Sequence, residues 1–299
     1  MARPSVRTCV RVSCVLALAG WTWLPDGGLA ARAASAERHL LLTVLDADGE
    51  PMTDLRTEQF VVLEDGELRP VTASRVATEP LSVVLMLDMT QPVIGQTLDI
   101  RGIRDAASSF IRTLHAAQPD ARIQLMEVAG APTVRMKFSN DTAALLQSAG
   151  RLFQSQQGDG PVIEAIVEAA RDLKNEKGVR RVIISVDRDS SDPSRQRPED
   201  VTRAVHDASA SVWAISIRET GRGSAMREEM LGFLTQEFGG TMQTARVLTP
   251  LENMLTRMAR VLANQYVVTY TRPDGADVTD ILAGTTTAGT VLMIDLAER

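Results

Sequence analysis

The stretch Leu81-Ser-Val-Val-Leu-Met-Leu-Asp-Met-Thr90 decides the fold of this chain. Six of its first seven residues are apolar, which is typical of a strand buried on both faces at the centre of a parallel sheet. The apolar run ends at Asp88, and Thr90 follows two residues later. Open α/β sheets bind ligands outside the carboxyl ends of their strands, so Asp88 and Thr90 are candidate site residues by position as well as by chemistry.

A second strand has the same design, because Arg181-Val-Ile-Ile-Ser-Val-Asp187 is also an apolar run that ends at an aspartate. From Leu81 to Ala263 the chain alternates predicted strands with predicted helices. This alternation predicts βαβ units and therefore an α/β fold, with a doubly wound, mostly parallel sheet of Rossmann type. The predicted strands 122–128 and 133–138 follow each other closely, so we expect them to form a hairpin at a sheet edge.

Both ends of the chain are predicted to contain strands and no helix. Strands are indicated at 39–45, 60–63 and 71–76, and again at 265–271 and 291–296. A unit of about 40 residues buries too little surface to fold alone. We therefore expect the two ends to pair into one small β-sandwich-like unit. The predicted division is a signal peptide at 1–36, an N-terminal β segment at 37–79, an α/β domain at 80–264 and a C-terminal β segment at 265–299.

The N-terminus indicates export. Three arginines precede an apolar run at 12–24, and small residues follow it in Ala31-Arg-Ala33 and Ala34-Ser-Ala36. This order is typical of a cleaved secretory signal peptide, and the run falls short of the ~20 residues that a membrane span needs. The expected location is periplasmic or extracellular, without membrane insertion after cleavage. Both cysteines, Cys9 and Cys14, lie in the signal, so the mature chain would have no disulfide and no thiol ligand.

The composition excludes some classes of function. With 44% apolar and 23% charged residues, the chain is typical of a globular protein. Its net charge is −6, which argues against a general nucleic-acid binder. The chain has no Gly-x-Ser-x-Gly elbow, phosphate loop or His-Glu-x-x-His motif, so no enzyme is predicted.

The order of elements resembles a von Willebrand factor type A domain. The matching motifs are the stretch that ends at Asp88, the stretch that ends at Asp187, and Phe238-Gly-Gly240 followed by a helix and Gln265-Tyr266. The flanking Val44-Leu-Asp-Ala-Asp-Gly-Glu-Pro51 and Phe60-Val-Val-Leu-Glu-Asp-Gly66 are similar to the exported bacterial proteins that are called von Willebrand factor A-related.

The resemblance implies a metal-ion-dependent adhesion site at the carboxyl edge of the sheet. The family pattern has an Asp-x-Ser-x-Ser motif, a threonine on a later loop, and a second aspartate. Asp88 and Asp187 match the aspartates, and Thr90 keeps the first hydroxyl. Pro92 replaces the second serine, and Gly160 aligns with the threonine. Two oxygen ligands are thus lost, so the site would hold Mg²⁺ weakly or hold no metal, and no cofactor is expected.

Arg188 stands where the family often has a glycine, and its guanidinium could neutralise Asp88 and Asp187 in place of a cation. We expect non-catalytic binding of a protein partner through a predicted binding face made of Asp88–Pro92, Gln156–Gly160 and Arg188–Arg197. Its candidate residues besides the site are Gln91, Pro92, Asp159, Gly160, Arg188 and Asp189. Two alternatives stay open: a structural role in envelope assembly through the β unit, and a metal-dependent hydrolase that uses Asp88 and Asp187.

Overall fold

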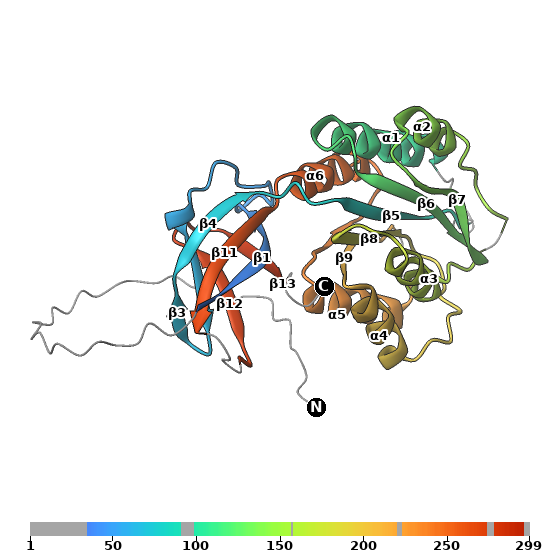
Figure 1. Cartoon of the computed structure of the whole chain (residues 1–299). Helices are drawn as coiled ribbons and strands as arrows, with labels where there is room; N and C mark the ends of the chain where they lie inside the picture. Colours follow the sequence, from blue (N-terminus) through green and yellow to red (C-terminus); the bar gives the residue numbers. More distant parts are fainter. Residues whose placement is uncertain (1–34, 91–98, 157, 220–222, 274–277, 296–299) are drawn as a thin grey trace, which may run out of the picture.

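The computed structural model describes residues 35–90, 99–156, 158–219, 223–273 and 278–295. The expected signal peptide, Gln91 and Pro92 therefore lie outside the described residues, apart from the last two residues of the signal. Figure 1 shows an α/β unit beside a unit made of strands, and the chain crosses between them twice. Among the described residues, no helix is both long enough and apolar enough to cross a membrane.

A six-stranded sheet forms the centre of the α/β unit, in the order β10-β9-β8-β5-β6-β7. Neighbouring strands are parallel except for β6 and β7, which form the expected antiparallel hairpin at one edge. Every residue of β5 is buried, which confirms that the opening stretch is a central strand. The strands are β5 (Leu81–Asp88), β6 (Arg122–Ala129), β7 (Ala131–Ser139), β8 (Arg180–Asp187), β9 (Ala210–Ile217) and β10 (Met242–Ala245).

Helices cover both faces of this sheet. Successive residues of each strand point to opposite faces, so each strand contributes side chains to two cores. Val83, Leu85 and Leu87 of β5 lie in one core with α1 (Ile100–Ala117), α2 (Thr142–Gly150) and α6 (Leu251–Ala263). Val84 and Met86 lie in a second core with α3 (Val162–Lys174), α4 (Pro198–Ala208) and α5 (Ala225–Glu237). The predicted α/β, doubly wound architecture is thus confirmed.

The two ends of the chain build one β sandwich, as expected. A four-stranded sheet, β13-β1-β11-β4, faces a three-stranded sheet, β12-β2-β3, across a shared apolar core. β1 pairs antiparallel with both β11 and β13, which joins the N-terminal and C-terminal segments. The strands are β1 (Ser35–Leu45), β2 (Phe60–Glu64), β3 (Glu67–Arg69), β4 (Val71–Val76), β11 (Tyr266–Pro273), β12 (Ile281–Thr285) and β13 (Thr290–Asp295), with a 3₁₀ turn at Thr57–Gln59.

A buried arginine joins the two units at the start of β8. The Arg180 side chain is 1% exposed, and its Nη1 donates to the Ala77 carbonyl at 3.2 Å and to Gln118 Oε1 at 3.1 Å. Its Nη2 donates to Gln265 Oε1 at 3.0 Å and also to the Leu262 carbonyl. Ala77 and Gln265 lie on the two crossings between the units. Burial lowers the pKa of Arg180 to about 10, and the neutral acceptors hold the guanidinium in place.

Two further contacts fix the β unit against α6. Glu50, in the turn after β1, pairs with Arg257 Nε at 2.9 Å and with Arg260 Nη2 at 2.9 Å. Leu45 of β1 and Leu292 of β13 join the apolar core beneath α6. The β unit is therefore attached to the α/β unit by a buried polar junction, an ion-paired turn and an apolar contact.

Replacing Arg180 tests this junction. In Arg180→Met, the Gln265 side chain and the Leu262 carbonyl lose their Arg180 donor while staying buried, so the free energy of unfolding should fall by about 2–4 kcal/mol. Urea unfolding followed by circular dichroism measures this change. Arg203→Met is the matched control, because the Arg203 side chain is 67% exposed, and its midpoint should stay that of the wild type. Equal midpoints for the two variants would contradict the assigned role of Arg180.

Candidate functional site

Asp88 closes the central strand β5 and is 2% exposed. Its Oδ1 accepts a hydrogen bond from the backbone N–H of Thr90 at 3.0 Å, which bends the chain as the strand ends. Its Oδ2 accepts from the backbone N–H of Arg188 at 3.1 Å and from Ser190 Oγ at 2.9 Å. Both carboxylate oxygens of Asp88 are thus occupied by donors of the protein itself.

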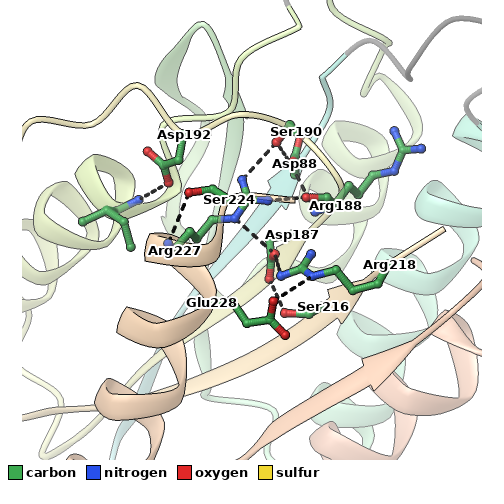
Figure 2. A network of polar contacts seen from close by, with 11 residues as sticks. Asp88, Asp187, Arg188, Ser190, Asp192, Ser216, Arg218, Ser224, Arg227 and Glu228 are labelled. Carbon is green, nitrogen blue, oxygen red and sulfur yellow. Dashed lines mark hydrogen bonds and ion pairs between the residues drawn. The ribbon is translucent and has the colours of Figure 1, made fainter. Parts of the chain in front are cut away.

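Asp187 closes the neighbouring strand β8 and is fully buried. Its Oδ1 accepts a hydrogen bond from Ser216 Oγ at 2.8 Å, and Ser216 is its direct partner in the register with β9. Its Oδ2 lies 2.7 Å from Arg218 Nη2 and 3.4 Å from Arg227 Nε (Figure 2). These two contacts are ion pairs by distance, and neither has the alignment of a hydrogen bond.

Burial and the ion pairs have opposite effects on the pKa of Asp187, and the effect of burial is the larger one. Burial raises the pKa of its carboxyl group above the ordinary value, because a charge is poorly solvated there. Arg218, Arg227 and the Ser216 hydroxyl act in the opposite direction. An ionised Asp187 therefore depends on the two guanidinium groups for its stability.

Arg227 connects this cluster to Asp88. It is fully buried on the first turn of α5, where its backbone N–H donates to the capping Ser224 Oγ at 3.3 Å. Its Nη1 donates to Ser190 Oγ at 3.0 Å, and its Nη2 donates to the Arg188 carbonyl. Because Ser190 in turn donates to Asp88, one polar network spans the ends of both strands (Figure 2).

The hypothesis that the Arg188 guanidinium neutralises Asp88 and Asp187 is wrong. The Arg188 side chain is buried, but Figure 2 shows it extending away from Asp187. Its Nη2 donates to Glu219 Oε2 at 3.0 Å, and its Nη1 lies 3.4 Å from the Thr90 carbonyl. Consecutive residues at a strand end point in opposite directions, so only the backbone N–H of Arg188 reaches Asp88.

Arg218 and Arg227 provide the neutralising charge, and the sequence interpretation missed both. A signal existed for Arg218. It follows Ser216 by two residues, so it lies on the same side of β9 as the residue that pairs with Asp187. For Arg227 there was no such signal, because it lies on a helix whose packing against β9 depends on the tertiary fold.

Gly160 lies beside Asp88, where the resemblance to the family places it. A Cβ atom at this position would lie 3.2 Å from Asp88 Oδ2 and 2.8 Å from Ser190 Oγ. The Gly160 backbone N–H donates to the Ser191 carbonyl at 2.9 Å, which fixes this close approach. The Ser190 hydroxyl thus fills the space that a threonine side chain at position 160 would need.

The predicted site residues differ in exposure. Asp88, Thr90 and Gly160 gather at the carboxyl edge of the sheet with Asp187 and Arg188, and all five are buried. Of the other predicted face residues, Asp159 is exposed and bonded to the Ser191 hydroxyl, and Asp189 is partly exposed. Gln91 and Pro92 lie outside the described residues.

This donor set does not fit a divalent cation. Mg²⁺ needs near-octahedral oxygen ligands, but both oxygens of Asp88 accept hydrogen bonds and Asp187 faces two guanidinium groups. A cation beside Asp187 would also be repelled by Arg218 and Arg227. Within the described part of the chain, no group of three His, Cys, Asp or Glu side chains is placed to hold a metal ion.

Solved structures with the same fold are known. A von Willebrand factor type A protein from Catenulispora acidiphila gives a TM-score of 0.53 at 12% identity, over 90% of this chain and 67% of that one. Proximal thread matrix protein 1 from the mussel byssus, with a zinc-occupied MIDAS motif, gives a TM-score of 0.54 at 12% identity, over 67% of this chain and 49% of that one. No protein-family model and no curated protein sequence matches the chain.

These likenesses confirm the predicted resemblance at the level of the fold. The α/β unit has the fold of a von Willebrand factor type A domain. The first of the two matches covers a larger share of this chain than the α/β unit alone contains, so it extends into the β sandwich.

Removing the charge of Asp187 tests the buried ion pairs. Asp187→Asn leaves the buried guanidinium of Arg227 without its carboxylate and leaves Arg218 with only Glu228, at 3.9 Å, so the free energy of unfolding should fall by about 3–5 kcal/mol. Asp159→Asn, at an exposed position of the same edge, should keep the wild-type midpoint in denaturant. If Asp187→Asn unfolded at the same midpoint as Asp159→Asn, the ion pairs would contribute nothing to stability.

Proposed function

We propose that this protein is an exported, non-catalytic protein-binding protein in which two arginines occupy the role of the metal ion of an adhesion site. The observation that carries the proposal is the contact of Asp187 Oδ2 with Arg218 Nη2 at 2.7 Å and with Arg227 Nε at 3.4 Å. Positive charge at the ends of β5 and β8 is then supplied by side chains and not by a bound ion. The α/β fold, shared with von Willebrand factor type A domains, supports a role in protein interaction.

This degenerate site changes how a partner would bind. A metal at such a site offers an open coordination position to an acidic residue of the partner. The mussel byssus protein has a zinc-occupied motif, whereas the present chain has two guanidinium groups at Asp187. Contact with a partner would therefore come from exposed residues around the site, which include Gly158, Asp159, Ser191, Pro193, Arg195 and Arg197.

The contacts of the candidate acid and base groups support a non-catalytic role. Both oxygens of Asp88 accept hydrogen bonds, and Asp187 is bonded to Ser216 and ion-paired with Arg218 and Arg227, which leaves neither carboxylate as a free base. His115 is buried at the far end of α1, where it bonds Thr142 Oγ1 at 2.8 Å and the Ala121 carbonyl at 2.9 Å. These contacts make it a structural histidine and disfavour the metal-dependent hydrolase.

Export is the remaining part of the proposal. The arginine-rich start, the apolar run at 12–24 and the small residues after it support a periplasmic or extracellular location. The mature chain would then fold without any cysteine, stabilised by its cores and by buried polar contacts such as those of Arg180.

Metal titration tests the degenerate site. Calorimetry with MgCl₂ and with ZnCl₂ should give no binding isotherm, and the melting temperature should be the same in excess Mg²⁺ and in EDTA. An ion bound only to the folded state would stabilise it by about 2.7 kcal/mol at one hundred times its Kd, which thermal melting detects easily. A one-to-one isotherm that disappears in Asp88→Ala would contradict the proposal.

Partner capture from the envelope fraction of the native organism tests whether the protein binds its partner through the predicted binding face or assembles through the β unit. The proposal expects Asp159→Ala combined with Arg195→Ala to lose the partners that the wild-type protein captures after cross-linking, and expects Leu68→Glu to retain them. Leu68 is 67% exposed on β3 of the sandwich, so its substitution tests the other unit without opening a core. Loss in Leu68→Glu alone would favour the envelope-assembly alternative.

A further inference from the structure

A half-exposed phenylalanine stands beside the predicted binding face, in the loop after α2. Phe153 is 51% exposed, and the guanidinium carbon of Arg135 lies 4.7 Å from the centre of its ring. The loop is fixed on both sides of the ring. Leu152 is buried and its carbonyl accepts from Arg104 Nε at 2.7 Å, while the Ser155 N–H donates to the carbonyl of Met89, next to Asp88, at 2.9 Å. The backbone that presents the ring is thus held in place.

Arg135 reaches the ring because of an irregularity in the edge strand. The pairing of β7 with β6 shifts register between Val134 and Met136, which leaves Arg135 as an extra residue. Such a bulge redirects a side chain and blunts the edge against strand pairing. Arg135 is aimed at the buried Glu127, with Nε 2.6 Å from Oε2, and covers one side of Phe153 on the way. At this edge of the sheet, a partner would therefore meet the Phe153 ring and Arg135 and would not meet a strand that is free to pair.

The surroundings of the ring are basic although the whole chain is acidic. Arg151 is exposed two residues before Phe153, and Arg104 contacts the loop through the Leu152 carbonyl. Arg101 is exposed one helical turn earlier on the same side of α1. The exposed acidic residues on this part of α1 are Asp105 and the capping Asp99, which accepts from the Gly102 N–H, and Glu127 already balances Arg135.

We infer that Phe153, with Arg104, Arg135 and Arg151 around it, anchors the proposed binding face, and that the partner presents an acidic segment with an apolar or aromatic side chain. The inference rests on the proposed function and names the class of partner. A rigidly held aromatic ring with arginines is the kind of group that dominates interface energies, because it buries apolar area at little cost in side-chain entropy. The basic surroundings select acidic segments by charge complementarity. A nucleic acid would also meet basic residues, but the net charge of −6 opposes a polyanion.

A peptide array tests this inference if net charge and aromatic content vary independently among the peptides. The full chain should prefer acidic peptides that contain Phe, Tyr or Leu. Phe153→Ala and, separately, Arg151→Glu should each weaken that binding by about tenfold or more. The matched control is Phe233→Ala, since Phe233 is 47% exposed on α5, which packs on the opposite face of the sheet, and its binding should stay within about twofold of the wild type.

Four results would overturn the inference: equal binding of acidic and basic peptides, no peptide binding, equal effects of Phe153→Ala and Phe233→Ala, or a preference for a single-stranded oligonucleotide over every peptide. The capture experiment with Asp159→Ala and Arg195→Ala separates this failure from that of the proposed function. If that double variant loses the native partner while Phe153→Ala keeps it, the binding face stands and the anchor does not.

Discussion

A carboxylate buried at a strand end must be satisfied by hydrogen-bond donors or paired with positive charge, and the carboxyl edge of this sheet is arranged around that requirement. Asp187 meets it with Arg218, which extends from the neighbouring strand, and with Arg227, which α5 presents from above. Arg227 then holds Ser190 and the Arg188 carbonyl, and these shape the loop that closes over Asp88. The position of α5, the conformation of the loop after β8 and the environment of both aspartates thus depend on one cluster of charges.

The sequence predicted the elements whose hydrophobic pattern is long and regular. The buried runs that end at Asp88 and Asp187, the β6–β7 hairpin and the pairing of the two chain ends all follow from such patterns. β3 and β12 were missed because the former has three residues with exposed or partly exposed side chains and the latter is only partly buried. Short strands of that kind form because adjacent strands pair with them, and a local hydrophobic pattern does not show which strands will be adjacent.

The candidate site shows the same division between local and tertiary information. The places of Asp88, Asp187 and Gly160 follow from strand ends and from one family resemblance, and the structure brings these three together. The partner of Asp187 could not be assigned in that way. Arg188 is adjacent in sequence and looked suitable, yet the alternation of side chains at the strand end sends it to Glu219, while Arg227 arrives from forty residues further along the chain.

The two guanidinium groups also differ from a metal ion in when the positive charge is acquired and in whether it can exchange with the medium. An ion is acquired after synthesis, exchanges with the medium and can be withdrawn by a competitor. A guanidinium is covalently part of the chain, so its positive charge is in place as soon as the fold closes. The positive charge beside Asp187 is therefore encoded in the amino-acid sequence and does not depend on which metal ions the surrounding medium contains.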